Sequence, residues 1–179
     1  MNIQRFINKS LFHIGRKVIG LLVYFDGRLY MKYLTRLLVC YGFKLNGTPR
    51  FIAKSVKFDD FELITLGDRL VISMNVHFLT HDYSYTTALI AIGEKPDTDI
   101  CIIREIKIGD NVFIGMNAII LPGANIGNHV IIGAGSVVRG VIPDYSVVVG
   151  NPAVIIGDIR EHVNKVKYRE CQIFNIDKH

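Results

Sequence analysis

The chain has 179 residues, of which 50% are hydrophobic and 21% are charged, and its formal net charge is +5. This composition excludes an intrinsically disordered chain, because it supplies enough apolar side chains for a large core. Residues 1–46 carry a charge of +7 and the remaining residues −2, so the basic character belongs to the N-terminal segment.

Residues 1–46 predict a basic helical arm. Apolar residues recur at helical spacing over Ile3–Phe25 and again over Arg28–Gly42, with Asp26 at the turn between them. The apolar run Val18–Phe25 is far shorter than the roughly 20 residues that a membrane-spanning helix needs. No small-x-small cleavage pattern follows it, so we expect no export signal. The arm has two interpretations, a cap on the open end of a repeat domain or a peripheral contact with anionic lipid.

A six-residue repeat dominates the second half of the chain. Aliphatic residues occupy every sixth position: Ile102, Ile108, Ile114, Ile120, Ile126, Ile132 and Val138. Glycine follows most of them by one place, and a small or β-branched residue follows by four places. A period of six fits neither a helix nor a single strand; it predicts a solenoid in which roughly three hexads close one triangular coil. The aliphatic side chains would point inward, and the glycines would permit close approach of the backbone.

The same phase continues upstream at Leu66, Ile72 and Phe78, and it lapses before Ile102. Residues 83–101 therefore predict a loop extruded from one corner, and a long loop inside a compact repeat is more often functional than not. After the repeat, charged and apolar residues alternate over Asp158–Glu170, which is consistent with a short helix. The predicted organisation is a helical arm (1–46), a β-helix (47–157) and a C-terminal helix and tail (158–179).

The late repeats carry a family resemblance. The segments Pro122–Ala124, Gly133–Ser136 and Val149–Ala153, together with the coil around Asn75 and His81, resemble the hexapeptide-repeat O-acetyltransferases related to galactoside, maltose and capsular-polysaccharide acetyltransferases. The resemblance implies an all-β solenoid, a left-handed parallel β-helix, that assembles as a homotrimer. It also implies acetyl-CoA as donor, a carbohydrate hydroxyl as acceptor and no metal.

On this resemblance His81 is the catalytic base, Asn75 lines the site and Asp82 stands beside the base. The chemistry asks for such a base independently, because an unperturbed imidazole with a pKa near 6.5 accepts a proton from a hydroxyl at neutral pH. Asp82 is a candidate to fix the histidine tautomer if the chain turns there. The developing oxyanion needs a donor, either a backbone N–H or an amide such as that of Asn75.

The resemblance also implies the donor site. Position by position, Gly115, Met116 and Ala134 correspond to the small-residue groove for the pantetheine arm of coenzyme A, which lies between two neighbouring β-helices. Arg139-Gly140 stands where relatives have a Thr-Lys pair that meets coenzyme A phosphates, so Arg139 is a phosphate-binding candidate. Arg160 is a weaker second candidate.

Other functions remain as alternatives. Zinc binding of the γ-carbonic anhydrase type is disfavoured, because His77 and His81 lack the expected spacing and a third nearby histidine. N-acetylation of an amino-sugar nucleotide uses the same donor and base, although residues 1–46 lack a nucleotide-binding βαβ pattern. A non-catalytic scaffold tethered to a membrane would leave the His81 coil unexplained, and nothing indicates nucleic-acid binding.

The cysteines bear on where the protein works. Cys40, Cys101 and Cys171 are odd in number and lack metal-binding spacing, so we expect reduced thiols. We expect a cytoplasmic protein, peripheral at the inner face of the membrane if the arm binds lipid.

Overall fold

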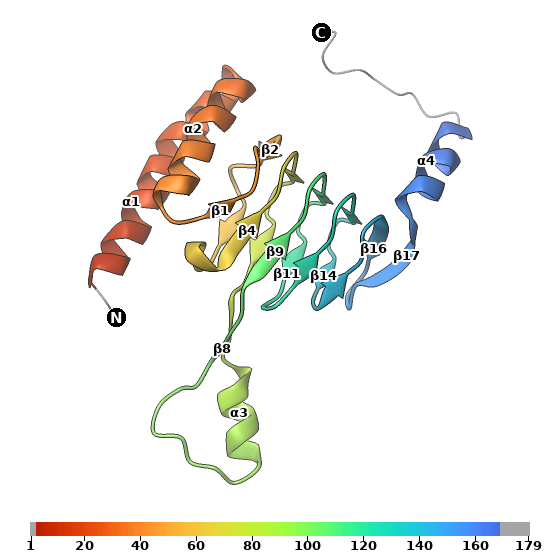
Figure 1. Ribbon diagram of the computed structural model, residues 1–179. Coiled ribbons are helices and arrows are strands. Elements are labelled where there is room, and N and C mark those ends of the chain that lie inside the picture. The colour runs from red at the N-terminus through yellow and green to blue at the C-terminus, as the bar shows by residue number, and fades with distance from the viewer. Residues whose placement is uncertain (1–2, 169–179) are drawn as a thin grey trace.

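The computed structural model describes residues 3–168 and shows a triangular β-helix flanked by helices at its two ends (Figure 1). Three parallel sheets form its faces. Sheet 1 contains β1 (Lys44–Leu45), β4 (Ile64–Leu66), β9 (Ile106–Ile108), β12 (Asn125–Ile126) and β15 (Val141–Ile142). Sheet 2 contains β2 (Phe51–Ile52), β5 (Val71–Ile72), β10 (Phe113–Ile114), β13 (Ile131–Ile132) and β16 (Ser146–Val149). A final strand, β17 (Val154–Asp158), pairs with β16 in the antiparallel direction. Sheet 3 contains β3 (Lys57–Phe58), β6 (His77–Phe78), β11 (Ile119–Ile120) and β14 (Val137–Val138).

The aliphatic repeat forms the core, as the sequence predicted. In sheet 2 the inward residues stack in register from coil to coil, in the order Ile52, Ile72, Ile114, Ile132 and Val148. All five are buried. Ile102 is the exception to the prediction: it lies in β8 (Ile102–Ile103), outside the column, and the buried series resumes at Ile106.

The corners explain a second periodicity of the sequence. The residue three places after an inward aliphatic has a positive φ angle at corner after corner, a conformation that asparagine and glycine adopt most readily. These corner residues include Arg69, Asn75, Asn111, Asn117, Gly123, His129, Gly135 and Tyr145. The glycine that directly follows an inward aliphatic is required for a different reason, the close approach of the neighbouring coil. A Cβ on Gly115 would lie only 2.5 Å from the backbone nitrogen of Ala134 in the next coil.

The N-terminal arm packs on the first coil. It comprises α1 (Ile3–Ile19), the 3₁₀ helix η1 (Gly20–Tyr24) and α2 (Gly27–Cys40), and Asp26 caps α2 by accepting hydrogen bonds from two backbone N–H groups. Phe12 of α1 is buried against Phe43 and Phe61, and the Tyr30 hydroxyl of α2 donates to the Ile52 carbonyl oxygen. The arm therefore covers the open end of the β-helix, as one of its two interpretations predicted.

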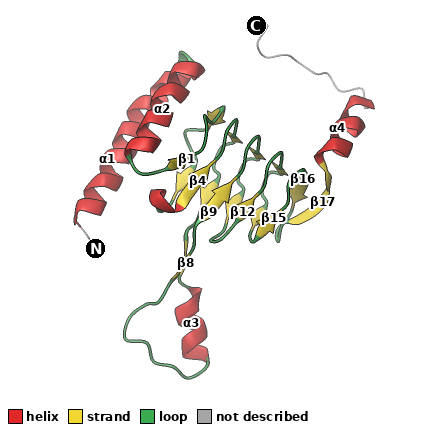
Figure 2. Ribbon diagram, viewed as in Figure 1, coloured by secondary structure: helices red, strands yellow, loops and turns green. Residues whose placement is uncertain are grey.

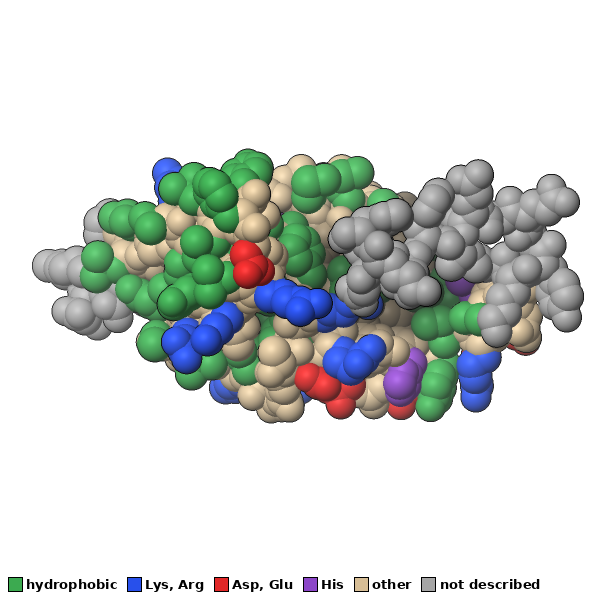
Figure 3. Space-filling model, turned by 90° about the horizontal axis from the view of Figure 1, so that it is seen from above, with side chains coloured by type: hydrophobic (Ala, Val, Ile, Leu, Met, Phe, Trp, Pro, Cys, Tyr) green, Lys and Arg blue, Asp and Glu red, His purple; other side chains and the backbone are tan. Residues whose placement is uncertain are grey.

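The arm also keeps an exposed apolar face. Five residues at heptad-like spacing are half or more exposed: Leu11, Ile14, Val18, Leu21 and Phe25. We call them the apolar stripe. Figure 3 shows hydrophobic side chains gathered over the helical arm. No helix in the described part of the chain is both long and apolar enough to cross a membrane.

Residues 83–101, for which the sequence predicts a loop, project from one corner of the prism (Figure 2). They are not structureless, however, because α3 (Ser84–Ala91) occupies eight residues of the segment. Its base is closed by an antiparallel pair of short strands, β7 (His81–Asp82) and β8.

At the other end of the prism, β17 reverses direction and leads into α4 (Ile159–Tyr168). This agrees with the predicted terminal helix up to Tyr168. The rest of that prediction, and Cys171, lie outside the described residues.

Candidate active site

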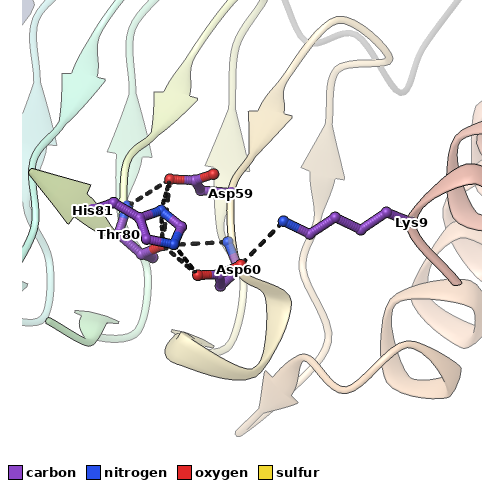
Figure 4. Close-up of polar contacts among 5 residues, drawn as sticks. All are labelled: Lys9, Asp59, Asp60, Thr80 and His81. Atoms are coloured by element: carbon purple, nitrogen blue, oxygen red, sulfur yellow. Dashed lines mark hydrogen bonds and ion pairs between the residues drawn. The ribbon is translucent and has the colours of Figure 1, made fainter. Parts of the chain in front are cut away.

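His81 lies where the extruded loop leaves the corner between sheets 3 and 1. The coil before it supplies two carboxylates, because β3 pairs with β6 in register and so places Asp59 and Asp60 beside the residues that follow Phe78. Asp59 Oδ2 is 2.6 Å from Nδ1 of His81, and Asp60 Oδ2 is 2.5 Å from Nε2 (Figure 4). The imidazole is thus held at both ring nitrogens.

The second carboxylate also connects His81 to the arm. The Asp60 side chain is only 2% exposed, and its Oδ1 is 3.0 Å from Nζ of Lys9 in α1. The Thr80 hydroxyl lies 3.4 Å from both Asp59 Oδ2 and Asp60 Oδ2. A buried carboxylate requires partners of this kind. The result is a continuous polar chain from Lys9 through Asp60 to His81.

This geometry defines what the histidine can do chemically. An imidazole that carries both ring protons can donate to both carboxylates at once. To act as a base it must present one nitrogen without a proton to a substrate hydroxyl. Asp59 can keep its hydrogen bond to Nδ1 while Nε2 exchanges Asp60 for the substrate, since Asp60 retains Lys9 as a partner.

Asp82 makes no hydrogen bond to the His81 ring, although the sequence made it a candidate to orient the histidine. Its side chain accepts a hydrogen bond from the Ser84 backbone N–H at 2.9 Å, and interactions with Ser84 hold the pKa of the Asp82 carboxyl below its usual value. His81 and Asp82 are successive residues of β7, and successive side chains of a strand point to opposite faces. Asp59 and Asp60 occupy the orienting positions instead.

An open groove of about 650 Å³ adjoins His81. Arg104 and Arg139 line it together with His81. The structure thus brings His81 and the predicted phosphate-binding candidate Arg139 to the same groove. Arg104, which the sequence analysis did not single out, adds a second cation there.

The other predicted donor-site residues gather at the next corner, between sheets 2 and 3. Gly115, Met116 and Ala134 lie on stacked coils there, and the Gly135 N–H donates to the Met116 carbonyl oxygen at 2.8 Å. Asn75 occupies the same corner one coil earlier, where it has a positive φ angle that asparagine adopts more readily than most residues. Asn75 and His81 line different grooves, at opposite edges of sheet 3.

Arg160 is engaged elsewhere. Its guanidinium makes two hydrogen bonds to Asp158, at 2.9 and 2.6 Å, and lies over the Tyr145 ring. These hydrogen bonds raise the pKa of Arg160 and lower that of Asp158 to about 2. Arg160 is not among the residues that line the His81 groove.

Sequence reasoning missed Asp59, Asp60 and Lys9. The signal was weak, because the short 3₁₀ helix η2 (Phe61–Leu63) separates the inward residues Phe58 and Leu66 by eight positions rather than six. The repeat therefore loses its phase at the coil that carries the two carboxylates. Lys9 reaches the site only through packing of the arm.

A parallel β-helix built of six-residue repeats places the chain in a class of proteins, the hexapeptide-repeat transferases. A family model described as bacterial transferase hexapeptide (six repeats) matches residues 105–140. The chain is 39% identical over 149 residues to protein CapG of Staphylococcus aureus, and the match covers 76% of this chain and 84% of CapG. The chain belongs to the hexapeptide-repeat acetyltransferase family.

Two further similarities define the extent of this relationship. WbbJ of Escherichia coli (strain K12), which is named as a lipopolysaccharide biosynthesis O-acetyl transferase, is 33% identical over 127 residues; the match covers 64% of this chain and 65% of WbbJ, just under two thirds. A solved structure described as galactoside acetyltransferase in complex with coenzyme A aligns with a TM-score of 0.61 at 21% identity, covering 93% of this chain and 90% of that one. The second similarity shows a shared fold.

Proposed function

We propose that the protein transfers an acetyl group from acetyl-CoA to a carbohydrate hydroxyl, as an enzyme of surface-polysaccharide or glycan biosynthesis. The observation that carries the proposal is the His81–Asp59 pair beside a groove that also presents Arg139. The name of WbbJ and the coenzyme A in the galactoside acetyltransferase structure support the donor and the reaction class.

His81 acts as general base in this reaction. Nε2 accepts the proton of the acceptor hydroxyl while that oxygen attacks the thioester carbonyl carbon. Asp59 holds Nδ1–H and stabilises the imidazolium that forms. The tetrahedral intermediate then expels the coenzyme A thiolate, which takes the proton back from Nε2. No covalent bond to the enzyme forms at any stage.

The residues at the corner between sheets 2 and 3 suit a thin pantetheine arm. Gly115 has no side chain, Ala134 has a small one, and the Met116 side chain beside them is exposed. Backbone at such a corner can be approached closely. Arg139 would meet the phosphates of coenzyme A, and Asn75 would donate an amide hydrogen to the oxyanion.

Gly115, Met116 and Ala134 flank the edge of sheet 3 opposite to His81 and Arg139, so one site that uses both sets requires two copies of the chain. We therefore propose a homotrimer of left-handed β-helices, with each active site in a groove between two neighbours. Light scattering after size-exclusion chromatography tests this arrangement. A mass three times that of the chain is expected, and a monomer with full activity would contradict it.

The arm contributes a further proposed property. Its apolar stripe and its basic residues suit peripheral contact with an anionic membrane surface. Vesicle flotation with and without phosphatidylglycerol tests this contact. Binding only to the anionic vesicles is expected.

The central experiment measures transfer of isotopically labelled acetyl from acetyl-CoA to free sugars, nucleotide sugars and lipid-linked oligosaccharides by mass spectrometry. Label on an ester oxygen, lost in His81→Ala while acetyl-CoA still binds, is the expected result. Full activity of His81→Ala would exclude His81 as the base. Label on nitrogen would instead identify an amino-sugar N-acetyltransferase.

A further inference from the structure

A second groove, of about 750 Å³, lies between the arm and the first coils of the β-helix. Four cationic side chains line it: Arg16, Lys17, Lys54 and Lys57. The residues of the described chain that line it include no aspartate or glutamate. We call it the arm groove. The arm groove is therefore lined by positive charge alone, whereas the His81 groove also has a carboxylate, that of Asp82, in its lining.

Arg16 differs from the three lysines because its charged side chain is buried. It is only 7% exposed, and within the described part of the chain its one hydrogen bond runs from Nη2 to the Ala53 carbonyl oxygen at 3.2 Å. Nε is buried without a partner, and no carboxylate of residues 3–168 forms an ion pair with this guanidinium. A buried cation without a counter-charge is costly unless an anion joins it.

The neighbouring titratable group reports the same excess of positive charge. Burial lowers the pKa of His13, and the nearby charges of Arg16, Lys9 and Lys17 lower it further. An anion in the arm groove would offset those charges. The pKa of His13 is therefore a sensor of occupancy.

The arm groove also adjoins the apolar stripe on one side and sheet 3 on another. Leu21, which belongs to the apolar stripe, lines it. Lys57 and Asn75 line both the arm groove and a smaller groove that includes His77 on sheet 3. His81 follows His77 by four residues, which is at most about 13 Å along a strand.

We propose that the arm groove binds the diphosphate that joins the acceptor sugar to its carrier. The guanidinium of Arg16 and the ammonium groups of Lys17 and Lys57 supply charge-assisted hydrogen bonds to phosphate oxygens. The sugar then extends along sheet 3 toward His81, and the carrier leaves past the apolar stripe. This inference rests on the proposed acetyl transfer and names its substrate class, a glycosyl diphosphate.

The first test measures binding without any acetyl donor. Calorimetric titration with inorganic pyrophosphate should give a saturable isotherm for the wild-type protein. The double variant Lys17→Gln/Lys57→Gln should weaken the affinity about tenfold or more, because both side chains are exposed and their loss removes two charge-assisted contacts. The matched control is Lys107→Gln, an exposed lysine of sheet 1, which should leave the affinity within twofold.

An independent readout follows His13 by NMR. Pyrophosphate should raise the pH midpoint of the His13 ring signal, since an anion favours the protonated imidazole. An unmoved midpoint, or no saturable binding by the wild-type protein, would overturn the proposal even if acetyl transfer to sugars is observed. Binding and a raised midpoint in a protein that transfers no acetyl group would support the anion site and refute the proposed function.

Two diphosphate compounds, compared in the same binding assay, identify the carrier. Farnesyl diphosphate that binds more tightly than pyrophosphate points to a lipid-linked acceptor, whereas tighter binding of UDP-N-acetylglucosamine points to a nucleotide-linked one. In acetyl-transfer assays, Lys17→Gln/Lys57→Gln should raise the KM for the diphosphate-linked acceptor and leave the KM for acetyl-CoA unchanged. Competition between coenzyme A and pyrophosphate, with a raised KM for acetyl-CoA in the variant, would overturn the assignment in favour of a donor-phosphate site.

Discussion

Nδ1 of His81 lies 2.6 Å from Oδ2 of Asp59, a residue 22 positions earlier in the chain that reaches it from the preceding coil. The contact depends on the stacking of β3 on β6, so the orientation of the proposed base depends on the solenoid itself.

Replacing Asp59 with asparagine removes the negative charge that stabilises a developing imidazolium and permits the wrong tautomer. We expect Asp59→Asn to lower kcat by about 10²–10⁴-fold, with the KM for acetyl-CoA within twofold. Steady-state acetyl-transfer kinetics measure both parameters. Asp82→Asn serves as the comparison, and we expect a loss below about tenfold. Equal losses in the two variants would contradict an orienting role specific to Asp59.

The ion pair between Lys9 and Asp60 should stabilise the docking of the arm. We expect a double-mutant cycle of Lys9→Met and Asp60→Asn, read from urea unfolding at fixed protomer concentration, to give a coupling energy of about 1–3 kcal/mol. The exposed pair Lys44–Glu105, with N–O distance 3.3 Å, provides the control and should give about 0.5 kcal/mol or less. Similar coupling in the two pairs would show that burial of Asp60 adds nothing.

Gly115 tests how closely the coils are stacked. An added Cβ would meet the Ala134 backbone nitrogen at 2.5 Å, and backbone inside a solenoid cannot move aside cheaply. We expect Gly115→Ala to lower the free energy of unfolding by about 1–3 kcal/mol. Gly157→Ala, where a Cβ would meet no atom within 4 Å, should change it by no more than about 0.5 kcal/mol. An unaffected Gly115→Ala protein would contradict this stacking distance.

Asp158 should titrate unusually low. Hydrogen bonds from the Arg160 side chain and backbone N–H bring the pKa of Asp158 to about 2, below its usual value. Because the folded pKa is depressed, this stabilising interaction is complete above about pH 4 and is lost as the pH falls toward 2. The Arg160 amide ¹⁵N shift, followed from pH 6 to pH 2, should have its midpoint near 2 and should lose this transition in Asp158→Asn. A midpoint near 4 would rule out the interaction in solution.

The fold was largely predictable because the six-residue spacing is a direct record of coil geometry. Ile108, Ile114 and Ile120 are buried as their positions required. The same count misplaced Ile102, because the extruded loop happens to keep the phase of six while the chain is outside the coil.

The site was predictable only in part, for physical reasons. His81 could be found from its local sequence. Its carboxylate partners could not, because they come from another coil and from a stretch where η2 breaks the repeat. Asp82 was favoured by adjacency, yet adjacency in a strand separates two side chains rather than joining them.

The arm does more than shield apolar side chains at the first coil. The outermost strand of sheet 2, β2, pairs with no further strand of residues 3–168 on its outer side, and backbone groups on such an edge, if exposed, would recruit a strand from another molecule. Here the carbonyl oxygens of Ile52 and Ala53 already accept hydrogen bonds from Tyr30 and Arg16. At the opposite end β17 occupies the edge of β16 in the antiparallel direction, which a further parallel coil could not continue. Both edges of sheet 2 are thereby closed to a further parallel strand, which opposes end-to-end growth of the solenoid along this face.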